Sequence, residues 1–204
     1  MPVLPRSLPQ VAALVLAITM SSQAAAAQSG GAAGGPYRPV TVWVGAAAST
    51  PISDFKEVAK SGFAGMGAVQ YRPEGKVWGV RGELQYHKMD MTPESLAEVG
   101  ASAGVTGTWS VLYGGATAVL ESMQRGSSFG WYVLAGGGSY RVEPSVSDAG
   151  VSVSVAKTSF GFNGGGGVRF KLGAVGLYLE GRYHTVTIDD SKVTLLPVSV
   201  GLVF

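Results

Sequence analysis

The sequence contains no cysteine among its 204 residues. This absence excludes a disulfide scaffold, a zinc site with cysteine ligands, a catalytic thiol and a lipidated N-terminal cysteine. Charged residues are also scarce, at 14% of the chain, where about 25% is usual for globular proteins. The net charge of +2 forms no basic stripe, so we expect neither a disordered chain nor a nucleic-acid partner.

Long hydrophobic runs are missing as well. The apolar segment at residues 11–20 has ten residues, whereas a membrane-spanning helix needs about 20. It follows the cation Arg6 and precedes the small residues Ala25-Ala26-Ala27, an order that predicts a secretory signal peptide over residues 1–27 rather than a membrane anchor. Residues 28–39, rich in glycine and alanine, predict a flexible leader, and residues 40–204 the folded body.

The body is rich in glycine and alternates apolar with polar residues, the two-residue period of β-strands. Between Val77 and Lys88, for example, the aromatic and aliphatic side chains occupy one face, and Arg81, Glu83, Gln85 and His87 occupy the other. Counting such segments predicts eight strands: 40–49, 61–71, 77–88, 106–120, 129–141, 158–171, 175–186 and 195–204.

The connections between these strands differ in length. Connections 50–60, 89–105, 142–157 and 187–194 are long and polar, with a short helix expected near residues 93–99. The connections at 72–76 and 172–174 are tight turns, and 121–128 is intermediate. Strands of about 10–14 residues with alternating long and short connections are typical of a membrane barrel. We therefore predict an all-β, eight-stranded, antiparallel up-and-down transmembrane β-barrel.

A membrane barrel places its apolar face outward and its polar face in the lumen. We expect Arg81, Glu83, Glu180 and Arg182 to form a charge network in the lumen, because an isolated buried charge is very costly. The outward faces should carry aromatic girdles at both ends. We assign to them these aromatic residues: Trp78, Tyr86, Trp109, Tyr113, Tyr132, Tyr140, Phe160, Phe170, Tyr183 and Phe204.

Two glycine runs, 136–138 and 164–167, fall inside predicted strands. In a small closed barrel we expect them to relieve crowding and allow bending. The cations of the short turns, Arg72, Lys76 and Arg125, are expected to be solvated, with inner-leaflet headgroups as a further contact.

Four segments resemble the outer-membrane β-barrel superfamily of OmpA, OmpX and opacity-type proteins. They are GWYVLAGGGSYR (130–141), FGFNGGGGVRFKL (160–172), GLYLEGRYHTV (176–186) and LLPVSVGLVF (195–204). The resemblance implies an eight-stranded barrel in the outer membrane of a Gram-negative-type envelope, surrounded by its lipid. It also implies that Phe204 is part of the signal read by the barrel-assembly machinery. Members of the family serve as structural proteins, adhesins, host-interaction proteins or narrow channels.

The two histidines, His87 and His184, are the main candidates for chemistry. A lipid A deacylase would carry a His-x-Ser-Asn pattern, which follows neither histidine. A metal site from His87, His184, Asp189 and Asp190 has no recognised ligand spacing. We therefore predict two polar lumen histidines, no catalytic residue, no metal and no cofactor.

Three functional hypotheses follow. The first is a non-enzymatic envelope protein whose loops 50–60, 89–105 and 142–157 recognise an external partner, since a rigid scaffold commonly presents binding residues on loops. The second is a narrow channel or a path for a small apolar solute. The third, a lipid-modifying enzyme, is the least supported because its motif is absent.

Overall fold

The computed structural model describes residues 38–98, 105–122, 127–148 and 151–204. The predicted signal peptide and nearly all of the predicted leader lie outside these ranges. Within them, no helix is long and apolar enough to cross a membrane.

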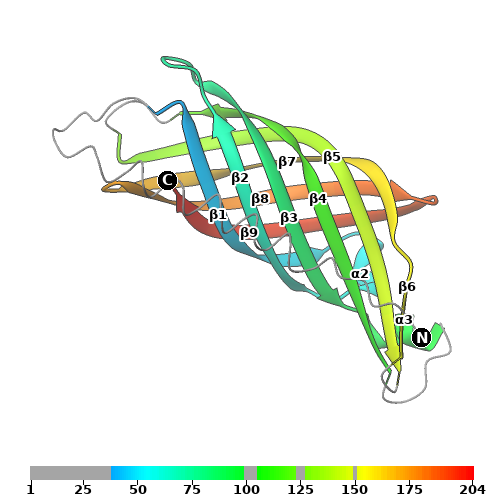
Figure 1. Cartoon of the computed structure of the whole chain (residues 1–204). Coiled ribbons are helices and arrows are strands. Elements are labelled where there is room, and N and C mark those ends of the chain that lie inside the picture. The colour runs from blue at the N-terminus through cyan, green and yellow to red at the C-terminus, as the bar shows by residue number, and fades with distance from the viewer. Residues whose placement is uncertain (1–37, 99–104, 123–126, 149–150) are drawn as a thin grey trace, which may run out of the picture.

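Nine strands form one sheet in the described residues, and eight of them close into a barrel (Figure 1). The sheet order is β4-β3-β2-β1-β9-β8-β7-β5-β6, and a further β4–β5 pairing completes the ring. The barrel strands are β1 (Val40–Pro51), β2 (Gly62–Tyr71), β3 (Trp78–Asp90), β4 (Thr106–Glu121), β5 (Phe129–Asp148), β7 (Lys157–Leu172), β8 (Val175–Ile188) and β9 (Ser191–Val203). All ring pairings are antiparallel, so the predicted eight-stranded antiparallel barrel is confirmed.

The barrel has two unlike ends. The turn end holds the short connections at residues 72–77 and 173–174, the end of β4 and the start of β5, together with the start of β1 and the end of β9. The loop end holds helix α2 (Phe55–Val58), helix α3 (Pro93–Glu98) and the ninth strand, β6 (Val151–Ser154). Helix α3 confirms the helix predicted near residues 93–99.

Two predicted loops are instead largely strand. Residues 142–157 continue β5 to Asp148 and return as β6, which pairs with β5 from Ser145 to Asp148. Serine and valine alternate in β6 and in the end of β5, so this hairpin has no strong apolar face. It needs none, because it extends past the closed barrel. Residues 187–194 extend β8 and β9 and leave a turn at Asp189 and Asp190, whose φ angles are 46° and 65°.

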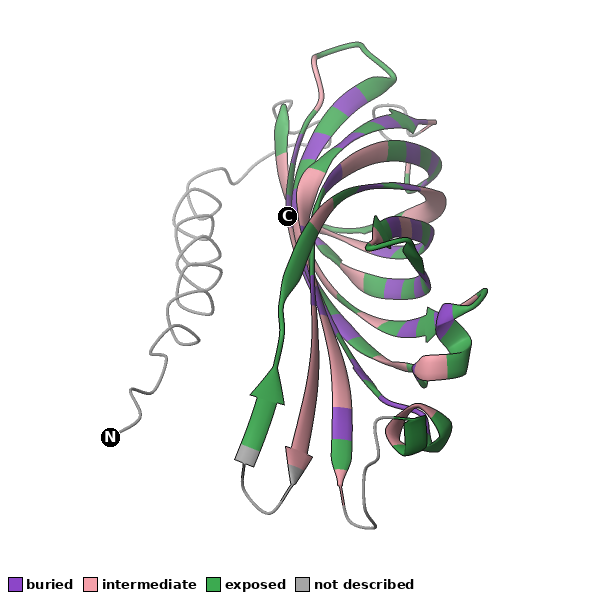
Figure 2. Ribbon diagram, turned by 90° about the vertical axis from the view of Figure 1, so that its right-hand side faces the viewer, coloured by how far each residue is buried: buried purple, intermediate pink, exposed green. Residues whose placement is uncertain are grey.

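The two faces of the strands follow the prediction for a membrane barrel. Trp78 and Leu179 are 47% and 50% exposed on the outside, whereas Arg81 and Glu180 are 0% and 1% exposed inside. Figure 2 shows buried and exposed residues alternating along the strands. The polar face therefore forms the packed interior of the barrel.

The girdle assignment is wrong for four aromatic residues. Tyr113, Tyr132 and Tyr140 are at most 3% exposed and lie in the lumen, and Trp109 is half-buried at the loop end. Successive residues of a strand point alternately inward and outward. Tyr132 and Tyr140 point inward because each lies two residues from a buried apolar residue of β5, Leu134 and Val142. A phenol suits this polar lumen because its hydroxyl finds partners there.

The inward glycines of the barrel make room for these tyrosines. A Cβ on Gly201 would lie 2.6 Å from the Tyr178 ring and 2.1 Å from the Val44 carbonyl oxygen, and one on Gly45 would lie 2.1 Å from Tyr178 Oη. Gly45 and Gly201 face each other across the β1–β9 pairing. An added Cβ would likewise approach Tyr113 from Gly115 and Gly138, Tyr132 from Gly167, and Tyr140 from Gly161. Within the two predicted glycine runs, Gly138 and Gly167 thus relieve crowding by leaving room for the Tyr113 and Tyr132 rings.

Candidate functional site: the lumen and its loop end

The predicted charge network forms in the middle of the lumen. Arg81 Nη1 donates to Glu180 Oε2 at 2.7 Å, and Arg182 Nη2 donates to Glu180 Oε1 at 2.7 Å. Arg182 Nη1 also donates to Glu83 Oε1. We call Arg81, Glu83, Glu180 and Arg182 the central ion network. It joins β3 to β8, which are not neighbours in the sheet, and therefore crosses the lumen.

Aromatic and amide groups surround this network. The Arg81 guanidinium carbon lies 3.9 Å from the centroid of the Trp43 ring, a cation–π contact. Tyr132 Oη donates to Glu180 Oε2 at 2.9 Å, and Gln70 Oε1 accepts from Arg81 Nε at 3.1 Å. Such hydrogen bonds are needed because buried ions lose their hydration.

A second cluster lies toward the turn end around the buried carboxylate of Glu121. Arg72 Nη1 donates to Glu121 Oε2 at 2.9 Å, and Arg169 Nη2 lies 3.7 Å from the same oxygen. Arg72 is thus half-buried rather than fully solvated, because it pairs with Glu121 of β4, whereas Lys76 is exposed. Arg125 lies outside the described residues. The alternation of Thr117, Val119 and Glu121 along β4 could have identified this inward carboxylate.

Toward the loop end, the next layer contains both histidines. Ser49 Oγ lies 2.9 Å from His87 Nδ1, and Tyr140 Oη lies 2.8 Å from His184 Nδ1. All four residues are at most 1% exposed. We call this group the histidine layer; the prediction of two polar lumen histidines is confirmed by their burial.

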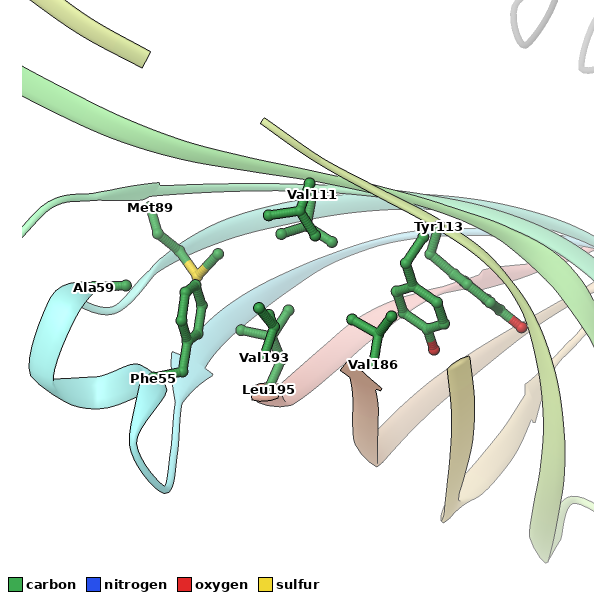
Figure 3. Packing of buried hydrophobic residues seen from close by; sticks show 10 residues of the cluster. Phe55, Ala59, Met89, Val111, Tyr113, Val186, Val193 and Leu195 are labelled. Atoms are coloured by element: carbon green, nitrogen blue, oxygen red, sulfur yellow. The ribbon is translucent and has the colours of Figure 1, made fainter. Parts of the chain in front are cut away.

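An apolar cluster packs at the mouth of the barrel, at the loop end. Figure 3 shows how its side chains lie against one another. Phe55 of α2 is 4% exposed and contacts the ring of Trp109, with ring centroids 5.4 Å apart. We call Phe55 and the residues around it the mouth plug: Ala59, Met89, Val111, Val193 and Leu195. Nothing in the loop sequence predicts that Phe55 turns inward.

Hydrogen bonds hold α2 against α3 and the barrel wall. Thr92 Oγ1 donates to the Glu57 carbonyl at 2.7 Å and accepts from the Ser95 amide at 3.3 Å in the first turn of α3. Trp109 Nε1 donates to the Val58 carbonyl at 3.1 Å. Two of the three predicted recognition loops, 50–60 and the described part of 89–105, are therefore packed together at the loop end.

The candidate chemical groups do not assemble into a catalytic centre. Ser49 and His87 do form a hydrogen bond, but His87 Nε2 has no partner and both side chains are buried. A serine hydrolase needs an accessible nucleophile and a group that orients the histidine. Asp189 instead pairs with Lys157 at the loop end. Among the described residues, no group of three or more His, Asp or Glu side chains is arranged to hold a metal.

Solved barrels share this fold at low sequence identity. Neisserial surface protein A is 18% identical, with a TM-score of 0.59, covering 81% of this chain and 96% of that one. The attachment invasion locus protein Ail of Yersinia pestis, solved with the heparin analogue sucrose octasulfate, is 20% identical, with a TM-score of 0.54 and coverage of 81% and 97%. A major outer membrane protein of Thermus thermophilus is 12% identical, with a TM-score of 0.52 and coverage of 82% and 99%.

No curated protein matches this sequence. The family described as outer membrane protein beta-barrel domain matches residues 11–204, which include the whole barrel. The closed eight-stranded sheet, the apolar exterior and the ion-paired lumen agree with that match. The chain therefore belongs to the outer membrane protein β-barrel domain family.

Proposed function

We propose that this protein is a non-enzymatic integral outer-membrane barrel that uses its loop end, facing the outside of the cell, to recognise a partner. The observation that carries the proposal is the lumen, which the central ion network crosses and the mouth plug covers. A filled lumen suits a rigid mount better than a pore. The predicted signal peptide would deliver the chain to the periplasm.

The exterior supports insertion in a bilayer. Exposed aromatic residues lie toward both ends of the strands, with small and aliphatic residues between them, as in a membrane barrel with two interfacial girdles. Those toward the turn end are Tyr71, Trp78, Phe129, Trp131, Phe170 and Phe204. Those toward the loop end are Phe63, Tyr86, Phe160, Phe162 and Tyr183.

Membrane fractionation tests this location directly. We expect the protein in the outer-membrane fraction, resistant to carbonate extraction, with a gel mobility that changes on boiling. An epitope placed at Asp189-Asp190 should be reachable on intact cells, whereas one placed at Gly173 should not. Recovery of the protein as soluble periplasmic material would contradict the proposal.

The loop end offers a structured surface for recognition. Strand β5 has 20 residues, about twice the 9–11 that cross a bilayer, so its final part extends beyond the membrane together with β6. Carboxylates outnumber cations at this end. The described carboxylates are Asp54, Glu57, Asp90, Glu94, Glu98, Glu143, Asp189 and Asp190, and the cations are Lys56, Lys60, Lys88, Arg141, Lys157 and Lys192.

This charge balance favours a ligand other than a polyanion, because like charges repel across an interface. The structure of Ail contains a heparin analogue, which is a polyanion. We expect this protein to bind heparin-agarose no better than its Lys157→Ala variant at physiological salt. Retention that is lost on that substitution would instead support a polyanionic ligand at the loop end.

A channel function is less supported, since Arg81, Glu180 and Arg182 join opposite walls of the lumen. Planar-bilayer recording of the purified protein tests it, and we expect no stable conductance. Stable channel openings by the unmodified protein would overturn the rigid-mount proposal.

A further inference from the structure

The two histidines of the histidine layer each have one nitrogen without a partner. Their Nδ1 atoms contact the hydroxyls of Ser49 and Tyr140, but the buried Nε2 atoms of both rings lack any hydrogen-bond partner. Buried polar atoms are nearly always partnered in folded proteins. Two such atoms in adjacent rings make this layer a candidate binding site.

A third orphaned atom lies close by. Asn163 pairs with His184 across the β7–β8 ladder, and its Oδ1 is buried without a partner. Its Nδ2 donates to Tyr113 Oη at 2.8 Å, which leaves the oxygen as the free acceptor. The Tyr113 ring lies 5.4 Å from the His184 ring, so all these groups belong to one small region of the lumen.

We propose that the histidine layer binds one transition-metal ion of the Zn²⁺ type through His87 Nε2 and His184 Nε2, with Asn163 Oδ1 as a third donor. The Nδ1–hydroxyl contacts fit this role. A histidine that ligates a metal through Nε2 normally donates its other ring N–H to an oxygen, which fixes the tautomer and the ring orientation. Imidazole is a common ligand for Zn²⁺, Cu²⁺ and Ni²⁺.

The separation of the rings agrees with a shared ion. The centroids of His87 and His184 are 5.8 Å apart, and the ring planes are inclined by 69°. With metal–nitrogen distances of about 2.0–2.1 Å, two imidazoles on one ion have centroids about 5.2–6.4 Å apart as the angle between them opens from tetrahedral to linear. The observed spacing lies inside this range.

The charges beside the layer balance one another. Arg182, the neighbouring cation, is paired with both Glu83 and Glu180, and the central ion network carries two positive and two negative groups. The described residues offer no third histidine or carboxylate to the site. We therefore expect an exchangeable ion rather than a permanent structural one.

Metal analysis of the purified protein tests the site. The untagged chain is folded into detergent micelles and equilibrated by dialysis against a series of free Zn²⁺ concentrations, and the metal bound to the chain is measured by mass spectrometry. We expect about one ion per chain, as for a single mononuclear site. His87→Gln and His184→Gln should each weaken Zn²⁺ binding at least tenfold, and Ser49→Ala about tenfold through the lost orienting contact.

Tyr178→Phe is the matched control, because it removes a buried, unpartnered hydroxyl from a different layer. Its Zn²⁺ binding should equal that of the unmodified chain, and heat-dependent gel mobility shows whether each variant has folded. If the unmodified chain retains no Zn²⁺, the proposal fails and a buried water is left to satisfy the nitrogens. If the folded double histidine variant retains Zn²⁺, the ion binds elsewhere and the proposal also fails.

Discussion

The middle of the lumen is filled by charged side chains and its mouth by apolar ones. The middle contains four buried charges held by directed hydrogen bonds, whereas the mouth contains Phe55 packed among aliphatic side chains and Met89. Removing one partner of a buried charge network leaves another charge unpaired, but trimming an apolar side chain costs only its own burial and a cavity. The middle should therefore tolerate substitution less than the mouth does.

The largest effect is expected for Glu180→Ala, which removes the carboxylate shared by Arg81 and Arg182. Two buried guanidinium groups lose a partner, and we expect the free energy of unfolding to fall by about 3–5 kcal/mol. Urea unfolding in detergent micelles measures this change. Glu143→Gln, in an ion pair whose members are 57% and 35% exposed, is the control and should change little. Equal effects of the two substitutions would show that the network contributes no special stability.

Phe55→Ala tests the mouth. We expect a loss of about 2–3 kcal/mol, below the 3–5 typical of a core phenylalanine, because a connecting loop relaxes more easily than a strand. The near-ultraviolet circular dichroism of Trp109 should also change, since its ring contacts Phe55. Conductance should stay absent while the central ion network is intact. If Phe55→Ala destabilises the barrel more than Glu180→Ala, the comparison between middle and mouth is reversed.

Gly201→Val tests how tightly the tyrosine rings of the lumen pack against the barrel wall. A side chain there collides with the Val44 carbonyl and the Tyr178 ring, and we expect a loss of about 1–3 kcal/mol from overpacking. Gly82→Val is the matched control, because a Cβ at this outward position meets nothing within 4 Å. Thermal unfolding of both variants provides the measurement. A destabilisation at Gly82 as large as at Gly201 would argue against tyrosine packing as the role of the inward glycines.

The smallest effect is expected for Lys157→Ala, which breaks the exposed pair with Asp189. Surface ion pairs contribute about 0–1 kcal/mol and weaken as salt increases. Unfolding measured at low and high salt should show a difference only at low salt. A salt-independent loss above that range would mean that this residue has a packing role.

Alternation along each strand was sufficient to place Arg81, Glu83, Glu180 and Arg182 in the lumen. It could not identify the partners, because Arg81 and Glu180 are 99 residues apart and meet only through the geometry of closure. The errors at Tyr113, Tyr132 and Tyr140 came from weighing residue type above strand parity. The inward turn of Phe55 depends on contacts with Trp109 and Met89 from other strands, and no local pattern encodes such contacts.

The seam between the first and last strands has a consequence for biogenesis. Phe204 and Val42 exchange two backbone hydrogen bonds, at 2.9 and 3.1 Å, although the whole barrel sequence separates them. Until β9 has been synthesised, a β1 strand paired with β2 lacks its second neighbour and presents a row of unsatisfied amides, a template for aggregation. The barrel can therefore close only after β9 is available to pair with β1.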